Sequence, residues 1–102
     1  MEIKKALNNQ NLIISIKGRL DTMTAPQLEE EIKGTSLDEV EMVTLNMREL
    51  EYISSSGLRV ILVLYKTMSK QGGHLKIVNV SDMIMELFTM TGMADYLDIE
   101  KA

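Results

Sequence analysis

Two hydrophobic periods alternate along this chain, and their order restricts the possible folds more than any other feature. Strand-like runs of apolar residues lie at residues 2–7, 12–17, 43–47 and 75–78. Segments with three- and four-residue apolar spacing, typical of helices, follow the second, third and fourth runs. Strands separated by helices favour parallel pairing, whereas the first two runs favour an antiparallel hairpin. We therefore expect an α/β fold, in which a mixed sheet of four or five strands with an N-terminal β-hairpin packs against three or more α-helices.

Capping residues and glycines mark the expected ends of the helices. Thr24 is a predicted N-cap, with Pro26 in the first turn, where a missing N–H costs nothing. Ser81 is the predicted cap of the third helix. The three helices are expected to end at Gly34, Gly72–Gly73 and Gly92. Residues 96–99 are predicted to form a last short strand or a turn.

Size and composition favour one globular domain covering residues 1–102. The chain has 102 residues, 45% hydrophobic and 25% charged, which suits a single core. There is no Trp, so the core is expected to consist of Leu, Ile, Val and some of the nine Met. Methionine fills core gaps but also suits adaptable binding surfaces, and composition alone does not separate the two roles.

Charge and targeting signals exclude several classes of protein. A formal net charge of -4 repels a phosphate backbone, which argues against nucleic acid as a partner. The absence of cysteine fits a reducing compartment. The start of the chain lacks the apolar stretch of a signal peptide, and the longest apolar run, Val60–Tyr65, is far below the ~20 residues that span a bilayer. We expect a soluble cytoplasmic protein with no direct membrane insertion.

Three serines followed by glycine, Ser54–Gly57, stand where a strand gives way to the second helix. The simplest interpretation is that Ser54 or Ser55 caps this helix. One cap needs only one serine, however, and Gly57 in the first turn costs about 1 kcal/mol relative to alanine. We expect the missing side chain of Gly57 to leave the neighbouring hydroxyls open to a partner. Because a helix N-terminus favours negative charge, a phosphate there would be tolerated by the fold.

At these residues the sequence resembles the STAS family (sulfate transporter and anti-sigma factor antagonist domains), most closely its stand-alone bacterial anti-sigma factor antagonists. The resemblance covers nearly the whole chain. It rests on Gly18–Asp21 with Thr24–Ala25, Val43–Asn46, Ile53–Val60, Gly72–Gly73 and Leu87–Gly92.

The resemblance implies a phosphorylation-controlled interaction switch. In its unphosphorylated form, such a protein binds an anti-sigma factor that is also a serine kinase, and the sigma factor is released. The kinase, which holds the nucleotide, then phosphorylates the antagonist. A PP2C-type phosphatase removes the phosphate and so resets the switch. The implied phosphoacceptor is Ser55. The residues expected near it are Asp21, Asn46, Ser54, Ser56 and Gly57, and those expected to contact the partner are Thr22, Thr24, Leu58 and Arg59.

One departure from the family pattern leaves an alternative open. Many members have Asp immediately before the phosphoacceptor, whereas this chain has Ser54, which removes a negative charge beside Ser55. The alternative is a STAS interaction subunit that is not phosphorylated, belonging to a lipid or anion transporter or to another signalling complex. Without the resemblance, the sequence is equally compatible with two roles for Arg59: a solvated side chain or a contact with a partner. We expect the side chains of Met83 and Met85 to pack at the core or its rim rather than to form an adaptable surface that binds a partner.

Enzymatic chemistry finds little support in the sequence. The Gly-x-Ser-x-Gly elbow of hydrolases is absent, and the one histidine, His74, lies on a different segment from the serines. The residues around Ser55 lack the lysine and spacing of a P-loop, and no His and Cys cluster suggests a metal. We therefore expect no catalytic residue, no cofactor and no metal.

Overall fold

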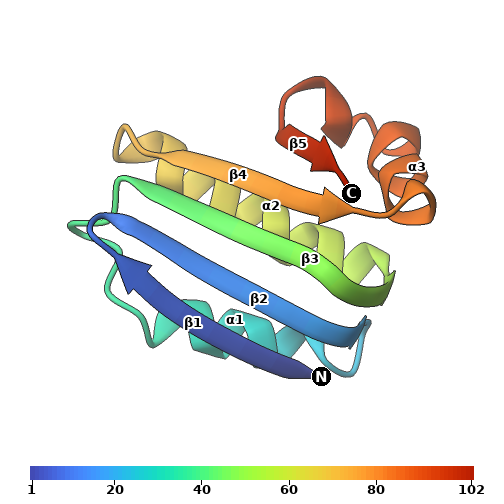
Figure 1. Cartoon of the computed structure of the whole chain (residues 1–102), viewed down its shortest axis with the longest axis horizontal. Helices are drawn as coiled ribbons and strands as arrows, with labels where there is room; N and C mark the ends of the chain where they lie inside the picture. Colours follow the sequence, from blue (N-terminus) through green and yellow to red (C-terminus); the bar gives the residue numbers. More distant parts are fainter.

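The computed structural model describes residues 1–102, and its five strands form one sheet in the order β1-β2-β3-β4-β5 (Figure 1). The strands are β1 (Glu2–Asn8), β2 (Asn11–Leu20), β3 (Met42–Ile53), β4 (His74–Val80) and β5 (Asp98–Lys101). β1 pairs antiparallel with β2, and every other neighbouring pair is parallel. The expected α/β class, mixed sheet and N-terminal hairpin are confirmed.

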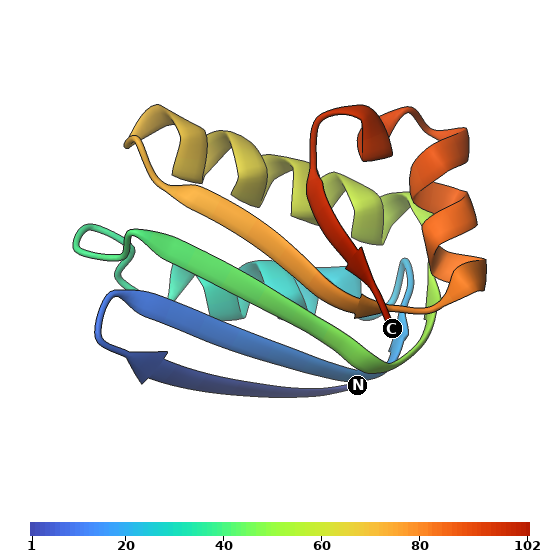
Figure 2. The ribbon, with the colours of Figure 1, turned by 45° about the horizontal axis from the view of Figure 1, so that its top comes forward.

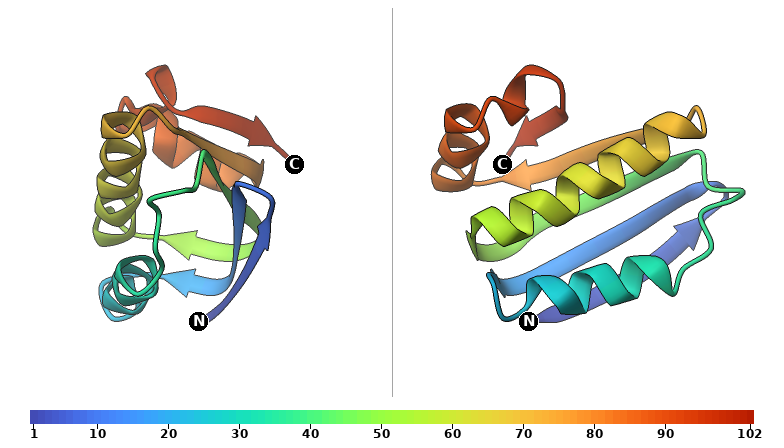
Figure 3. Two further views of the ribbon diagram at one scale, coloured as in Figure 1. Left: turned by 90° about the vertical axis from the view of Figure 1, so that its left-hand side faces the viewer. Right: turned by 180° about the vertical axis from the view of Figure 1, so that it is seen from behind.

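Three α-helices accompany the sheet. They are α1 (Ala25–Lys33), α2 (Ser55–Lys70) and α3 (Asp82–Met90), followed by the short 3-10 helix η1 (Met93–Asp95). α1 and α2 lie on the same face of the sheet, and α3 lies beyond the end of β4 (Figures 1 and 3). None of the helices is both long and apolar enough to cross a membrane.

The core lies between the sheet and the helices, and it contains 24 buried hydrophobic residues and no buried polar one. Alternation along the strands explains this, because residues at every second position share one face. In β2, for example, Leu12, Ile14 and Ile16 point toward the helices. Met47, Met68 and Met93 are buried, so part of the methionine serves the core.

The connections that follow β2, β3 and β4 leave the sheet at one edge, because these strands are parallel (Figure 2). We call this edge the carboxyl edge; it consists of residues 21–24 after β2, Ser54–Ser56 after β3, and Ser81 after β4. The N–H of Ser54 donates to the carbonyl of Leu20 at 2.9 Å, which joins the first two connections directly.

Strand β3 is much longer than the predicted run at residues 43–47. Relative to β2 it contains two extra residues, since Ser15–Lys17 faces Asn46–Glu49 and Gly18–Arg19 faces Leu50–Tyr52. Each extra residue shifts the side-chain alternation, so Leu50 and Ile53 still point into the core although the two-residue period is broken. The shorter prediction was wrong because it relied on an unbroken period.

The stability that α3 contributes should depend on Phe88, the single phenylalanine of the chain. Ile84 and Phe88 are the two fully buried side chains of α3. We expect Phe88→Ala to lower the free energy of unfolding by about 3–5 kcal/mol, because it leaves a large cavity. Urea unfolding followed by circular dichroism measures this.

The control for Phe88→Ala is Met90→Ala on the same helix. Met90 is 75% exposed, so its truncation should change the free energy of unfolding by less than about 0.5 kcal/mol. Equal effects of the two substitutions would contradict the packing described for α3.

Candidate functional site

The three serines at the start of α2 have three different environments. Ser54 is the N-cap: its backbone is extended and its hydroxyl accepts from the N–H of Gly57 at 3.4 Å. Ser55 is the first helical residue and is exposed. The Ser56 hydroxyl lies 3.4 Å from the hydroxyl of Thr22. The predicted cap is therefore confirmed at Ser54, and it leaves Ser55 free of that task.

The surroundings of Ser55 suit a negatively charged group. Its hydroxyl forms no hydrogen bond within the chain, so it is free to react or to bind. The first N–H groups of a helix have no partner in the preceding turn, and the helix dipole adds partial positive charge at this end. A phosphate on the Ser55 oxygen would thus stand beside free donors rather than inside the core.

Gly57 is required by packing and does not expose the neighbouring hydroxyls as predicted. The residue is buried, and a Cβ atom placed on it would lie 2.7 Å from Cγ of Leu20 and 2.9 Å from Cγ1 of Ile53. Both neighbours are themselves buried at the ends of β2 and β3. The missing side chain therefore allows the start of α2 to approach the sheet closely.

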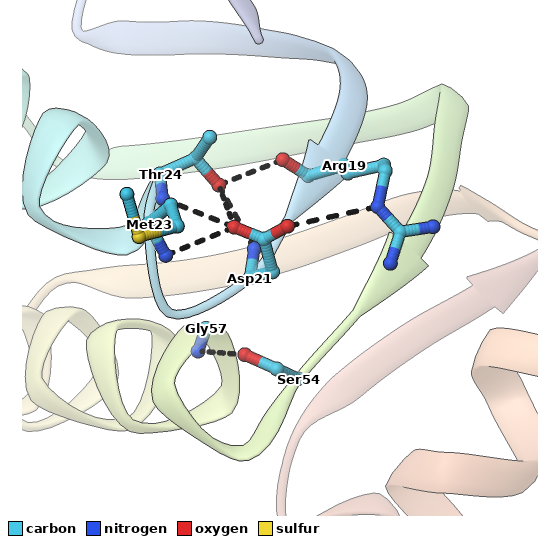
Figure 4. Close-up of polar contacts among 6 residues, drawn as sticks. All are labelled: Arg19, Asp21, Met23, Thr24, Ser54 and Gly57. Atoms are coloured by element: carbon cyan, nitrogen blue, oxygen red, sulfur yellow. Dashed lines mark hydrogen bonds and ion pairs between the residues drawn. The ribbon is translucent and has the colours of Figure 1, made fainter.

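A network of hydrogen bonds around Asp21 fixes the loop between β2 and α1 (Figure 4). One carboxylate oxygen, Oδ1, accepts from the N–H of Met23 at 3.0 Å and from the N–H of Thr24 at 3.1 Å. The Thr24 hydroxyl donates to the carbonyl of Arg19 at 2.7 Å and accepts from the N–H of Asp21 at 2.8 Å. Thr24 holds the N-cap position of α1 but gives that helix no side-chain cap, because its hydroxyl is used within the loop.

Arg19 completes this network and was not among the predicted site residues. Its Nε lies 3.6 Å from Oδ2 of Asp21, and its guanidinium lies 4.3 Å from the ring centroid of Tyr52 on β3. Partial burial opposes ionisation of Asp21, but the Thr24 and Met23 N–H groups, the Thr24 hydroxyl and Arg19 outweigh it, and the pKa of this carboxyl is lowered. Asp21 therefore carries its charge at neutral pH, close to the start of α2.

The predicted neighbours of Ser55 are only partly brought together. Asp21, Ser54, Ser56 and Gly57 lie at the carboxyl edge, with Thr22 joined to Ser56. Asn46 does not lie there. It precedes the end of β3 by seven residues, about 23 Å at the usual rise of a strand.

The Asn46 side chain has its own partners, which lie near the end of β4 and on β3 itself rather than at Ser55. Its Oδ1 accepts from Nδ2 of Asn79 at 2.8 Å and from the N–H of Arg48 at 3.1 Å. Because Leu45 and Met47 on either side point into the core, Asn46 lies on the opposite face of the sheet. The expectation that Asn46 is near Ser55 was wrong, because a strand residue was placed by motif order and not by strand length.

The expected partner contacts also differ in exposure. Thr22 and Arg59 are exposed, and Thr24 is half-buried. Leu58 is only 8% exposed and belongs to the core, so the prediction that it contacts a partner does not fit the structure. Met23, which no sequence pattern singled out, is 86% exposed in the loop beside Thr22.

Three further residues discussed from the sequence lie elsewhere. Met83 is exposed, whereas Met85 packs partly against the core. His74 begins β4 and pairs with Asp98 of β5 at 2.7 Å. Because β3 and β4 are parallel, His74 lies at the edge of the sheet opposite Ser55, so it is no base for that hydroxyl.

Gly57→Ala should destabilise the protein although alanine favours helices. We expect the free energy of unfolding to fall by about 1–3 kcal/mol, because Leu20 and Ile53 must move to admit the methyl group. Ser69→Ala on the exposed side of α2 is the matched control and should cost less than about 0.5 kcal/mol. Denaturant titration of both variants checks this, and a stabilised Gly57→Ala protein would contradict the close packing.

Asp21→Asn should reveal a pH-dependent contribution to stability. The pKa of Asp21 is lowered in the folded state from about 3.8, so the unfolded state binds more protons between the two values. Stability from the Asp21 charge is therefore complete above that ordinary value and is lost as the pH falls through the lowered one. We expect Asp21→Asn to be less stable than the unaltered chain at pH 7, with the difference shrinking below about pH 4.

Thermal unfolding of both proteins across this pH range measures the effect. Asp38→Asn, on the connection before β3, is the control, because no hydrogen bond or ion pair holds its side chain. A difference between Asp21→Asn and the unaltered chain that stays constant down to pH 2 would contradict the assigned charge.

The sequence matches the STAS domain family over residues 2–102. It is 32% identical to the anti-sigma-B factor antagonist of Bacillus subtilis over 92 residues. This alignment covers 90% of this chain and 84% of that protein. An anti-sigma factor antagonist from Mycobacterium paratuberculosis has the same fold, with a TM-score of 0.87 at 20% identity over 99% of this chain and 86% of the other. The phosphorylated form of SpoIIAA from Bacillus superposes with a TM-score of 0.75 at 18% identity, over 96% of this chain and 90% of the other. The chain therefore belongs to the STAS domain family, and its relatives there include anti-sigma factor antagonists.

Proposed function

We propose that this protein is an anti-sigma factor antagonist that changes partners when Ser55 is phosphorylated. The observation that carries the proposal is the exposed Ser55 hydroxyl, free of hydrogen bonds, at the first residue of α2. In the unphosphorylated state the protein binds an anti-sigma factor and so releases a sigma factor. The anti-sigma-B factor antagonist of Bacillus subtilis, 32% identical, supports this role.

The phosphoryl group comes from ATP held by the partner, an anti-sigma factor that is a serine kinase. Oγ of Ser55 attacks the γ-phosphorus, a new P–O bond forms, and the bond from that phosphorus to the bridging oxygen breaks, so ADP leaves. The hydroxyl proton passes to a base of the kinase. A PP2C-type phosphatase reverses the change by hydrolysis, which returns the serine and inorganic phosphate. In both steps this protein is the substrate, and it has no enzymatic activity of its own.

The local structure explains why phosphorylation of Ser55 would leave the domain folded but would dissociate its complex with the anti-sigma factor. The phosphate adds about -1.5 to -2 charge at a helix N-terminus, where free N–H groups and the helix dipole stabilise it. The same charge faces outward, so a partner surface packed against Ser55 must desolvate it on binding. SpoIIAA from Bacillus, which shares this fold, also exists in a phosphorylated form.

The partner contacts consist of the exposed residues around Ser55. Thr22 and Arg59 flank it from the β2–α1 loop and from the next turn of α2. Thr24 acts indirectly, because its hydroxyl positions the Asp21 loop. Leu58 is left out of this surface because it is buried.

A second candidate is a STAS subunit that binds its partner without being phosphorylated. It is favoured by Ser54, which caps α2 with a neutral hydroxyl and puts no carboxylate next to Ser55. A kinase that recognises such a carboxylate would not modify this chain. The partner would then be a lipid or anion transporter, or another signalling complex.

Phosphosite mapping distinguishes the two candidates. The purified chain is incubated with ATP and each anti-sigma factor kinase encoded in its source genome, and the modified residue is located by mass spectrometry. We expect one phosphate, on Ser55, and none on Ser55→Ala. Ser55→Ala should bind the kinase as the unaltered chain does, whereas Ser55→Asp should bind at least about tenfold more weakly.

Ser56→Ala is the control, since Ser56 is the adjacent serine in the same turn, and it should still be phosphorylated. Phosphate on Ser54 or Ser56 alone would overturn the assignment of Ser55. Stable binding without any phosphate would favour the second candidate.

A further inference from the structure

The outer face of α2 carries a cationic stripe formed by Arg59, Lys66 and Lys70. All three side chains are exposed, and none of them forms an ion pair within the chain. Helix α2 contains no acidic residue at all, although the chain has a net charge of -4. The stripe is thus a local positive surface on an acidic protein.

Pairing elsewhere in the chain makes this stripe distinct. The chain has 11 Lys and Arg residues. Six of these form ion pairs: Lys5, Lys17, Arg19, Lys33, Lys76 and Lys101. Of the five that remain, Lys4 and Arg48 lie on strands, and the other three form the cationic stripe. Most cations of this protein have internal partners, whereas the stripe has none.

Ser55 lies at the N-terminal end of the same stripe. Arg59 follows it by four residues, Lys66 follows Arg59 by seven, and Lys70 follows Lys66 by four, so all four residues share one face of the helix. From Ser55 to Lys70 the face extends about 22 Å along the helix axis. No other element covers this face of α2 in the view from behind (Figure 3, right).

An apolar groove borders the stripe. The groove lies between α1 and α2, has a volume of about 450 Å³, and is lined by the hydrophobic residues Ile32, Leu37, Val60, Val63 and Leu64. Val63 is 56% exposed and lies one turn after Arg59, so it belongs to both the groove and the outer face of α2. A partner covering this face meets positive charge and apolar surface side by side.

We infer that the anti-sigma factor docks along the whole outer face of α2 through an acidic surface, with an apolar side chain seated in the groove beside Val63. This inference rests on the proposed function, because it extends the contact at Ser55 to the length of the helix. Charge complementarity selects acidic residues on the partner, since three unpaired cations must be matched when they are desolvated. A partner helix in which acidic and apolar residues alternate at helical spacing fits such a face.

The stripe also gives phosphorylation a second way to release the partner. A phosphate on Ser55 lies one helical turn from Arg59, within the range of an i,i+4 pair. It therefore takes up the charge of Arg59 and repels the acidic residues of the partner at the same time.

An acidic protein is a better occupant than an anionic membrane. The net charge of -4 repels an anionic bilayer, and three cations alone provide weak attraction to one. The stripe also begins one helical turn after Ser55, which the proposed function already places in contact with a protein.

Charge reversal along the stripe tests the inference. The variant Lys66→Glu/Lys70→Glu is compared with Lys4→Glu/Arg48→Glu, which makes the same change of charge at the two other unpaired cations, on strands β1 and β3. Binding to the anti-sigma factor that holds the unphosphorylated chain is measured by surface plasmon resonance at low salt and at about 0.5 M salt. Circular dichroism confirms that both variants are folded.

We expect Lys66→Glu/Lys70→Glu to bind at least about tenfold more weakly at low salt, mainly through a slower association rate, and to lose most of the salt dependence. The control variant should stay within about twofold of the unaltered chain. Val63→Asp should also weaken binding, because it places a charge in the apolar groove.

Three results overturn the inference in distinguishable ways. If Lys66→Glu/Lys70→Glu binds like the control while Ser55→Asp still abolishes binding, the docking surface is wrong and the proposed function stands. If the unaltered chain binds no anti-sigma factor, the proposed function fails and this inference fails with it. If the stripe instead mediates sedimentation with phosphatidylglycerol vesicles and has no effect on partner binding, its ligand is a membrane.

Discussion

Parallel pairing of β2 with β3 is the constraint on which the rest of the site depends. It brings the ends of both strands to one edge of the sheet, where the N–H of Ser54 donates to the carbonyl of Leu20 at 2.9 Å. The first turn of α2 then packs directly on these strand ends, with Gly57 against Leu20 and Ile53. Because no side chain separates helix from sheet at this point, the position of Ser55 is fixed by the core and does not depend on a flexible loop. The kinase and the binding partner of the proposed function would therefore meet the same, preformed surface.

This arrangement separates the residues that hold the helix from the residue that is proposed to change. Ser54 caps α2, Gly57 packs against the sheet, and neither task involves the hydroxyl of Ser55. The Asp21 network fixes the neighbouring loop through backbone groups and Thr24, so it too is independent of that hydroxyl. The proposed phosphorylation of Ser55 would therefore break none of these contacts, while it would change the charge of the outer surface. A regulator needs this separation, since a switch that also unfolded its domain would not be reset by a phosphatase.

The sequence predicted the fold better than it predicted the site. Helix ends followed from local signals, as at Ser54 and Ser81, whose hydroxyls both cap helices. The length of β3 could not be predicted from periodicity, because its two extra residues relative to β2 shift which side chains point inward. Asn46 was misplaced for a different reason, because the order of residues in a motif does not give their distance along a strand. The role of Gly57 was also hidden, because its close contacts are with residues 37 and 4 positions earlier in the sequence, and only the folded structure brings Leu20 and Ile53 together there.

The neutral cap at Ser54 and the cationic stripe of α2 together affect how strongly a phosphate would change this surface. A carboxylate at position 54 would put a negative charge at the start of α2 before any modification, and the phosphate would then add to an existing charge. With a hydroxyl there, the only charged side chains that α2 itself contributes to its outer face are positive until Ser55 is modified. The phosphate then changes the sign of the potential at one end of that face, next to Arg59. Ser54, which departs from the family pattern, therefore lets a phosphate on Ser55 be the first negative charge on this face of α2, which favours a partner that recognises the charge along the helix.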